Sequence, residues 1–430
     1  MSHNVFVLGL DAFNRAKLEA LPLAEICAFH GLLRPEDVGE PETYDIGTLM
    51  SRAEAELTAF SGSIDAIVGY IDIPVGLMLP ILCAKFSLRS PSLKSVLKCQ
   101  HKYWSRLIQA EVIPEHIPQF TIFDPFDSRA LEGIALAYPF WIKPVKSGGS
   151  HLGFRINRAE DFHRALPLIQ QALPRLAEPF NYLMEYSDLP PGVADVDAYH
   201  FIAESILTGR QCTLEGYVHE GEVRVYGVVD SIRHRNRTTF FRYQYPSALP
   251  QRLHRRMVEI ATRVLTHVGL DDAPFNVEFF WRPGDDTLWL LEINTRISQS
   301  HAPLLEKVDG ASNHQVMVEI ALGRPPGLLR RKGPFRCAAK FYLRSFVDAI
   351  VTRVPSEEEI AALAADIPGV EILPLVGEGT RLSSIPEQDS YSYALAYLFI
   401  GGDNQADLLR KYRHCLANLP FETTLVTTAT

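Results

Sequence analysis

Two apolar stretches, FNVEFFW (275–281) and LWLLEIN (288–294), are typical of paired β-strands joined by a turn at 283–286. A turn at this place sets Glu278 opposite Glu292 across the hairpin. Like charges that face each other on antiparallel strands are destabilising, so a compensating cation is expected there. An exposed hairpin with scattered charges is the alternative, but the bulky apolar residues on both strands disfavour it.

The neighbouring side chains indicate the chemical class of this cation. Asn294 lies two residues beyond Glu292, and residues two apart in a strand share a face. Carboxylate and amide oxygens suit a hard ion such as Mg²⁺ or Mn²⁺. We therefore predict a metal site made of Glu278, Glu292 and Asn294. Arg296, one step further along the same face, is placed to bind a phosphate or a carboxylate with its planar guanidinium.

A glycine-rich loop precedes the hairpin in the sequence. Lys143 ends an apolar strand pattern and is followed by Ser147, Gly148, Gly149 and Ser150. Glycines let backbone N–H groups approach phosphate oxygens, and a lysine supplies a point charge. The segment is not a Walker A motif, because no Gly-Lys-Ser/Thr opens a helix here. Taken alone, an ordinary turn is the more common explanation of such a loop.

The flanking segments indicate a mixed α/β and α+β chain. Strand and helix patterns alternate through residues 1–115, which predicts an N-terminal domain with a doubly wound parallel sheet. Ligands of such sheets bind beyond the carboxyl ends of the strands, so the loop 69–72 is a candidate cleft loop, with a simple connection as the alternative. Helices are expected over 94–110 and 159–173, and an α+β tail is expected beyond Gly323.

Composition argues against two kinds of partner. The net charge is −9 and the basic runs are short, which disfavours nucleic-acid binding. The apolar stretch 73–84 contains two prolines and falls short of the roughly 20 residues of a membrane span. The six cysteines lack paired spacing and the N-terminus lacks a basic signal-like segment, so free thiols and a cytoplasmic location are expected. A chain of 430 residues is expected to form several structural units.

The order of these elements resembles the ATP-grasp superfamily over residues 97–296. In that superfamily one lysine on a helix and a second lysine before a mobile glycine-rich loop contact the nucleotide, and Lys102 and Lys143 match them. The superfamily's metal ligands are an acid on one strand and acid-x-Asn on the next. Glu278 and Glu292-Ile293-Asn294 match this pattern.

The resemblance implies an ATP-grasp architecture with a doubly wound N-terminal domain, a two-lobed ATP-binding region and a C-terminal α+β subdomain. The implied cofactors are ATP and Mg²⁺ (or Mn²⁺). The expected segments are a Rossmann-like domain (1–115), a small lobe with the glycine-rich lid (116–205), a large lobe with the metal site (206–325) and the α+β subdomain (326–430).

The resemblance also implies a hinge strand whose backbone contacts adenine. The segment 201–209 resembles this hinge, and the strand-like segment 182–186 is the alternative. The superfamily commonly has a glutamate on the ribose hydroxyls after the hinge glycine, where this chain has Gln211, and Glu215 is a second candidate for that role. The implied nucleotide contacts are Lys102, Lys143, Ser147, Gly148, Gly149, Ser150, Glu204, Ile206, Gln211 and Glu215.

The activity implied by the resemblance is ATP-dependent ligation with release of ADP and phosphate. A small carboxylate, such as an amino acid, is activated as an acyl phosphate and joined to an amine, with Lys143 and Arg296 as catalytic side chains. The candidates for substrate contacts are Arg233 (or its neighbours Arg235 and Arg237), Ser298 and His301. Small carboxylates and amines are the expected partners, and a homodimer is left open.

Within the superfamily, the long tail favours the carboxylate–amine (L-amino acid) ligase branch over the D-alanine ligases, which end soon after the metal motif. A biotin-carboxylase-like enzyme has a similar tail and is one alternative. A nucleotide-binding subunit without turnover is the other.

Overall fold

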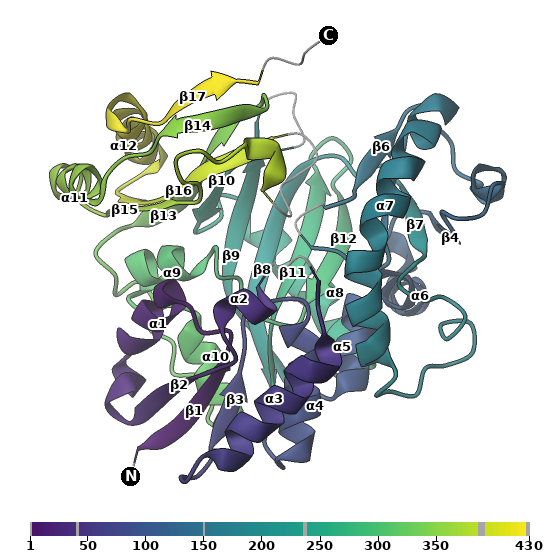
Figure 1. Ribbon diagram of the computed structural model, residues 1–430, viewed down its shortest axis with the longest axis horizontal. Helices are drawn as coiled ribbons and strands as arrows, with labels where there is room; N and C mark the ends of the chain where they lie inside the picture. The colour runs from purple at the N-terminus through teal and green to yellow at the C-terminus, as the bar shows by residue number, and fades with distance from the viewer. Residues whose placement is uncertain (1, 40–42, 149–150, 235–238, 386–391, 427–430) are drawn as a thin grey trace. The chain divides into compact units, whose positions relative to one another are not determined.

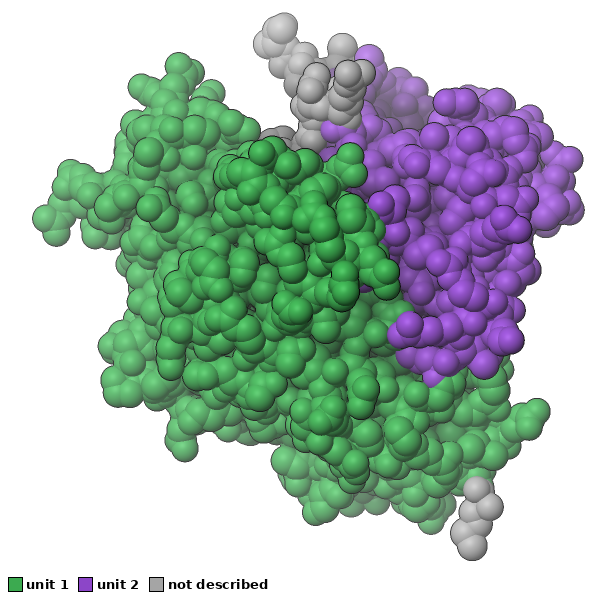
Figure 2. Space-filling model, turned by 180° about the vertical axis from the view of Figure 1, so that it is seen from behind, with its two compact units in different colours: residues 1–227, 249–298, 314–327 green, residues 228–248, 299–313, 328–430 purple. Residues whose placement is uncertain are grey.

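The computed structural model describes residues 2–39, 43–148, 151–234, 239–385 and 392–426 (Figure 1). The chain divides into two compact units, each built from separate stretches of sequence (Figure 2). Unit 1 comprises residues 1–227, 249–298 and 314–327, and unit 2 comprises residues 228–248, 299–313 and 328–430. The four expected segments are continuous, unlike these units, and they stay a prediction.

Unit 1 begins with the parallel sheet expected from the sequence. Its strand order is β2 (Cys27–Leu32), β1 (His3–Leu8) and β3 (Ala66–Val68), with both pairings parallel. The helices around it are α1 (Ala12–Glu19), α2 (Pro35–Val38), α3 (Ile46–Ala59), α4 (Val75–Lys85) and α10 (His314–Ala321). Val5 and Val7 of β1 share a core with α1 and α10. Phe6, on the opposite face, packs on Phe60 at the end of α3, so both faces are covered as a doubly wound sheet requires.

The single helix expected over 94–110 is in fact two helices, and this part of the prediction is wrong. α5 (Leu93–Gln100) ends at His101, and α6 (Lys102–Val112) begins immediately after it. The Nδ1 atom of buried His101 accepts a 3.2 Å hydrogen bond from the backbone N–H of Trp104, so the imidazole caps a new helix. Lys102 therefore lies in the first turn of α6.

A second sheet of unit 1 is antiparallel and has the order β4-β7-β5-β6. Its strands are β4 (Phe120–Phe123), β5 (Phe140–Pro144), β6 (Phe154–Ile156) and β7 (Phe201–Ser205). β5 ends next to the glycine-rich loop, and β7 ends next to the segment that resembles a hinge. Two of the expected nucleotide-contacting segments therefore start from neighbouring strands.

α7 (Ala159–Met184) is longer than the helix expected over 159–173. Three prolines lie inside it, but buried apolar side chains continue at helical spacing past them, among them Leu176, Phe180 and Leu183. Packing of this apolar stripe outweighs the hydrogen bonds that the prolines remove. Residues 182–184 are helical, so the alternative hinge strand at 182–186 is wrong.

The predicted hairpin is present with the predicted register. β11 (Ala273–Arg282) and β12 (Thr287–Asn294) are antiparallel, with Glu278 opposite Glu292 and Asn276 opposite Asn294. β8 (Arg210–His219) pairs with the other edge of β11, and β9 (Glu222–Arg233) follows, which gives the order β12-β11-β8-β9. Glu220, in the turn between β8 and β9, has a positive φ, as does the next residue, Gly221, which suits a two-residue hairpin turn.

The two faces of this hairpin sheet differ in chemistry. α8 (Gln251–Val268) covers one face, where Met257 contacts Cys212 with 3.3 Å between the sulfurs. Phe275, Val277 and Phe279 point to the same face and are fully buried. The opposite face carries Gln211, Thr213, Glu215, Asn276, Glu278, Glu292 and Asn294. The sheet thus separates an apolar core from a polar surface.

Unit 2 contains the strand order β9-β10-β13-β16-β15 and a separate antiparallel pair, β14-β17. These strands are β10 (Phe240–Tyr245), β13 (Cys337–Ser345), β14 (Ala349–Arg353), β15 (Val370–Pro374), β16 (Tyr393–Gly402) and β17 (Glu422–Leu425). The helices are α9 (Ala302–Asp309), α11 (Glu357–Asp366) and α12 (Gln405–Asn418). Phe341 and Leu398 join a core with Leu363 of α11 and Leu408 of α12, which cover one face of the sheet.

Local features mark the ends of two helices. Ser356 and Glu359 form a capping box at the start of α11. Gly323, two residues after the end of α10, has a positive φ. The described residues also contain the short 3-10 turns η1 (Pro22–Glu25), η2 (Pro114–His116), η3 (Ala130–Gly133) and η4 (Leu382–Ser384). All six cysteines are free thiols. Within the described ranges, no helix combines the length and apolar character that a bilayer crossing requires.

Candidate functional site

The predicted metal ligands lie together on the polar face of the hairpin. Glu278 and Glu292 are directly opposite, and Asn294 is buried beside Asn276. The Nδ2 group of Asn294 donates to Oδ1 of Asn276 at 3.0 Å, which keeps the amide oxygen of Asn294 as its ligand atom. The described residues contain no cluster of three or more His, Cys, Asp or Glu side chains that could hold a metal. Two carboxylates and one amide are an all-oxygen set, which fits a hard ion.

Gln211 contacts one of these carboxylates. Its Nε2 group donates to Oε2 of Glu278 at 2.6 Å, and the Gln211 side chain is buried. The residue expected to hold a ribose therefore orients a candidate metal ligand. Glu215, the second ribose candidate, is fully buried in the middle of β8 and accepts a 3.1 Å hydrogen bond from the hydroxyl of Tyr226.

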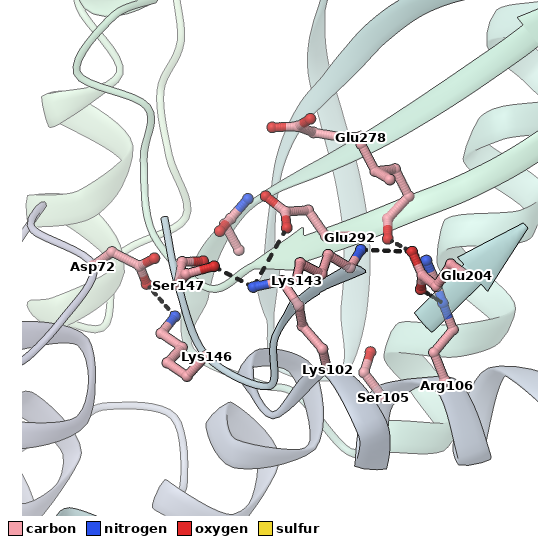
Figure 3. Close-up of polar contacts among 12 residues, drawn as sticks. Asp72, Lys102, Ser105, Arg106, Lys143, Lys146, Ser147, Glu204, Glu278 and Glu292 are labelled. Atoms are coloured by element: carbon pink, nitrogen blue, oxygen red, sulfur yellow. Dashed lines mark hydrogen bonds and ion pairs between the residues drawn. The ribbon is translucent and has the colours of Figure 1, made fainter. Parts of the chain in front are cut away.

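Lys102 joins the glycine-rich loop to the carboxylates (Figure 3). Its Nζ donates to the backbone oxygen of Ser147 at 2.8 Å and lies 3.9 Å from Oε2 of Glu292. Burial lowers the pKa of Lys102 to about 8, although the charge of Glu292 opposes this shift. A lysine on α6 and the loop after β5 are therefore in contact, as expected for two parts of one binding site.

A buried ion-paired cluster lies next to this contact (Figure 3). Glu204 accepts from Nζ of Lys143 at 2.7 Å and from Nε of Arg106 at 2.7 Å. Burial would raise the pKa of Glu204, but the charges of Arg106 and Lys143 and their hydrogen bonds lower it to about 2. Arg106 also donates to the backbone oxygen of Leu291 at 2.7 Å, so the cluster ties α6 to the metal-site strand β12.

The position of Glu204 refines the expected adenine contact. Glu204 lies inside its sheet, with Phe120 of β4 on one side and Trp141 of β5 on the other. Its side chain is held by the two cations. Residues beyond the end of β7, beginning with half-buried Ile206, are the first to leave the sheet and are better placed to present backbone groups to a ligand.

A third group of charges involves Asp72, which the sequence indicated only as part of a candidate cleft loop. Its Oδ1 accepts from Nζ of buried Lys146 at 2.9 Å (Figure 3). Its Oδ2 lies 4.0 Å from Nη2 of Arg296. Burial would raise the pKa of Asp72, but the charges of Lys146 and Arg296 lower it to about 2. The Nε of Arg296 is buried and has no hydrogen-bond partner among the described residues, so this guanidinium has capacity for an anion.

The glycine-rich loop lies partly within the described residues. Ser147 is buried, and a Cβ on Gly148 would lie 3.6 Å from Oδ2 of Asp72, an ordinary van der Waals distance. Packing against the described residues therefore does not require glycine at position 148. Gly149 and Ser150 lie outside the described residues.

The candidates for substrate contacts fall in both units. Ser298 is half-buried in unit 1, close in sequence to Arg296. Arg233 and His301 belong to unit 2, where the Arg233 guanidinium lies 4.4 Å from the ring centre of Phe240. The His301 ring is buried. Arg235 and Arg237 lie outside the described residues.

The sequence alone assigned no individual role to four residues of the site: Asp72, Arg106, Lys146 and Asn276. The sequence does contain a pattern that points to Asp72, because this residue follows the carboxyl end of β3, where ligands of doubly wound sheets bind. A pattern also points to Asn276, since it shares a strand face with Glu278. No local pattern points to Arg106 or Lys146, because their partners are distant in sequence.

A comparison with protein families matches residues 136–303 to the ATP-grasp domain. This range contains Lys143, Glu204, the facing pair Glu278 and Glu292, and Arg296. No curated protein sequence matches the chain significantly.

Solved structures of similar fold cover nearly the whole chain. An L-amino acid ligase from Bacillus licheniformis has a TM-score of 0.73 at 16% identity, over 98% of this chain and 98% of that chain. The biotin carboxylase domain of a Hydrogenobacter thermophilus 2-oxoglutarate carboxylase, solved with MgADP, has a TM-score of 0.63 at 13% identity, over 99% and 92%. An N5-carboxyaminoimidazole ribonucleotide synthetase from Thermotoga maritima has a TM-score of 0.62 at 13% identity, over 99% and 100%. At these identities the similarity concerns the fold.

Proposed function

We propose that the protein, whose residues 136–303 match the ATP-grasp domain, is an ATP- and magnesium-dependent ligase. It activates a small carboxylate, in our proposal an amino acid, as an acyl phosphate and joins it to an amine. The products are an amide or peptide, ADP and phosphate. The similarity of the chain's fold to those of ATP-grasp ligases does not depend on which substrates are proposed.

The observation that carries the proposal is the pair Glu278 and Glu292, facing each other beside Asn294, with Lys102 3.9 Å from Glu292. Two facing carboxylates beside an amide oxygen form an all-oxygen donor set of the kind that binds a hard divalent cation. Mg²⁺ held by these three oxygen ligands would neutralise phosphate charge during transfer. The fit of the site to the ion rests on this donor set.

The side chains of the chain divide the remaining work. Lys102, Lys143 and the backbone of the glycine-rich loop would bind the nucleotide phosphates. Arg296, with its unused buried Nε, would stabilise charge on the transferred phosphoryl group. Asp72 and Glu204 would hold Arg296 and Lys143 in position before the nucleotide binds.

The proposed reaction has two steps. An oxygen of the substrate carboxylate attacks the terminal phosphorus, the bond to the bridging oxygen breaks and ADP leaves. The amine then attacks the carbonyl carbon, the C–O bond to phosphate breaks and the amine proton passes to solvent. Positioning and charge neutralisation supply most of the catalysis in such transfers.

The test is incubation of the purified protein with ATP, Mg²⁺ and pooled amino acids. We expect ADP and phosphate in equal amounts together with new amide products detected by mass spectrometry. Release of AMP and pyrophosphate would contradict an acyl phosphate. ADP release that requires bicarbonate and increases with biotin would instead support a carboxylase, and nucleotide binding without turnover in any pool would contradict an enzyme.

A further inference from the structure

A carboxylate and a guanidinium of unit 1 lie close together without a hydrogen bond between them. Asp72 follows the carboxyl end of β3, and Arg296 follows the metal-site strand β12, so both residues belong to unit 1. Oδ2 of Asp72 and Nη2 of Arg296 are 4.0 Å apart. This separation exceeds that of a hydrogen bond, so the two charges attract each other without occupying each other's hydrogen-bonding atoms.

Asp72 uses only one of its two carboxylate oxygens. Oδ1 accepts from Nζ of Lys146 at 2.9 Å, which is the contact drawn for Asp72 in Figure 3. No donor among the described residues lies at hydrogen-bond distance from Oδ2. The side chain is 14% exposed, so bulk water has little access to it. Oδ2 is therefore an acceptor that the protein leaves unused, although buried polar atoms usually have partners.

Arg296 likewise retains donors. Its Nη1 donates to the backbone oxygen of Ile297 at 3.3 Å, and its buried Nε has no partner in the part of the chain that the structure describes. A guanidinium carries five N–H donors in a planar fork, which suits a carboxylate or a phosphate. An unused acceptor and unused donors of opposite charge thus lie next to each other.

Asp272, also in unit 1, shows what a structural aspartate looks like in this protein. Its side chain is 16% exposed, close to the value for Asp72. Its Oδ2 accepts from Nη1 of Arg89 at 2.9 Å, and its Oδ1 lies 3.0 Å from Nδ1 of His219. Both oxygens of Asp272 have partners within the protein, whereas Asp72 keeps one oxygen open.

The glycine-rich loop leaves space beside that open oxygen. A Cβ on Gly148 would lie 3.6 Å from Oδ2 of Asp72 and, apart from its chain neighbours, would meet no other described atom within 4 Å. Oδ2 therefore borders open space on the side of this loop. A small group that carries a positive charge can reach it there.

We propose that Asp72 and Arg296 bind the substrate that is activated as an α-amino acid zwitterion, with its ammonium on Oδ2 of Asp72 and its carboxylate beside Arg296. This inference rests on the proposed function and names the residue that selects the substrate class. One carbon separates the ammonium of an α-amino acid from its carboxylate, which suits protein groups 4.0 Å apart. A carboxylic acid without the ammonium would leave Oδ2 unpaired, so Asp72 disfavours it.

The first experiment compares amino acids with their des-amino analogues, such as phenylalanine with 3-phenylpropionate. The full chain is incubated with ATP, Mg²⁺ and hydroxylamine, whose nitrogen attacks the acyl carbon of an acyl phosphate and releases phosphate. Activation is thus measured as hydroxamate, without an amine substrate. We expect wild type to prefer its best amino acid over the des-amino analogue by at least about ten-fold in kcat/KM. Equal use of the two would overturn the proposal.

Variants of Asp72 test which side chain recognises the ammonium. Asp72→Asn keeps the shape but removes the charge, so we expect it to lose most of the preference for the amino acid. Any loss that both substrates share reports instead on the position of Arg296. Asp72→Glu keeps the charge and should keep part of the preference. An Asp72→Asn variant with the wild-type preference would overturn the assignment.

Asp272→Asn is the matched control. It removes the charge of a similarly exposed aspartate of unit 1, so we expect it to lower the melting temperature and to keep the preference. Because the preference is a ratio within one protein sample, partial unfolding of a variant does not affect it. Loss of the preference in Asp272→Asn to the same extent as in Asp72→Asn would contradict a specific role for Asp72.

The same assay keeps this inference apart from the proposed ligase function. Absence of hydroxamate with every amino acid and every des-amino acid would contradict the formation of an acyl phosphate, and with it the ligase function. Hydroxamate formed equally well from both classes would contradict the ammonium site at Asp72 alone, because activation of a carboxylate would still occur.

Discussion

Units 1 and 2 both bury lysines beside a sheet, but they balance the charge differently. In unit 1, Lys143 and Lys146 each contact a carboxylate, Glu204 at 2.7 Å and Asp72 at 2.9 Å. In unit 2, Lys340 contacts a hydroxyl and aromatic rings. The protein itself therefore balances the charge of these two unit 1 lysines with carboxylates, whereas a hydroxyl and aromatic rings surround Lys340.

Unit 1 also contains two acids that face each other across the hairpin, Glu278 and Glu292. Glu292→Gln keeps the side-chain shape but removes one metal ligand, and we expect ADP release to fall on the order of 10³-fold. The free energy of unfolding should change little, because the substitution also removes repulsion with Glu278. Steady-state ADP release and thermal unfolding measure the two effects. Exposed Glu222→Gln is the control, and normal turnover in Glu292→Gln would refute the metal assignment.

Removing Glu204 from unit 1 should leave Lys143 and Arg106 without a carboxylate partner, as Lys340 is in unit 2. Glu204→Gln leaves Lys143 and Arg106 buried without their partner, so we expect the free energy of unfolding to fall by about 3–5 kcal/mol. Urea unfolding at neutral pH measures this loss. A loss of under about 1 kcal/mol would show that the carboxylate of Glu204 is not needed to balance the buried cations of unit 1, and would contradict the contrast with Lys340.

The same substitution has a pH signature. Burial opposes ionisation of Glu204, but Arg106 and Lys143 lower its pKa to about 2, below the value of about 4.3 expected in an unfolded chain. Ionised Glu204 therefore stabilises the fold fully above about pH 4.3, and this contribution is lost as the pH falls toward 2. Wild type should lose more stability than Glu204→Gln across this window. Parallel stability curves for the two proteins would contradict the ion pairing.

Asp72→Asn should affect catalysis more than folding. The substitution weakens the contacts that position Lys146 and Arg296, and we expect kcat/KM for the proposed reaction to fall about 10- to 100-fold. If Asp72 positions Arg296 for phosphoryl transfer, most of the loss appears in kcat. A change confined to the KM for ATP would assign Asp72 to nucleotide binding alone.

The smallest expected effect is on the stability of Lys340→Met. Replacing an unmatched buried cation with an apolar side chain of similar length should leave the melting temperature unchanged or raise it slightly. Lys143→Met should lower it, because Glu204 then loses a partner. Differential scanning fluorimetry compares the two. Equal destabilisation would mean that Lys340 is as well matched as Lys143.

The sequence alone predicts the positions of site residues where the alternation of side chains along a strand determines which residues face each other. Alternation along β11 and β12, with a turn between them, predicts that Glu278 faces Glu292, and the structure confirms it. The resemblance adds Lys102 and Lys143, which the structure places next to Glu292 and Glu204 respectively. Local patterns of this kind do not depend on how distant segments pack.

Local patterns were insufficient where distant segments meet. The pairs Asp72–Lys146 and Arg106–Glu204 join positions far apart in the chain, so spacing carries no sign of them. The helix break at His101 depends on a single side-chain cap. The extension of α7 past its prolines depends on packing of its apolar stripe. In the ion pairs and in α7, contacts between distant segments outweigh local propensity.

The central claim, that Glu278, Glu292 and Asn294 hold a divalent ion beside the nucleotide, is tested most directly by Mn²⁺ binding followed by electron paramagnetic resonance. With ADP present, wild type and Glu222→Gln should convert free Mn²⁺ to a protein-bound signal, whereas Glu292→Gln should leave most of it as free or ADP-bound ion. Equal Mn²⁺ binding by all three proteins would contradict the assignment of the metal site.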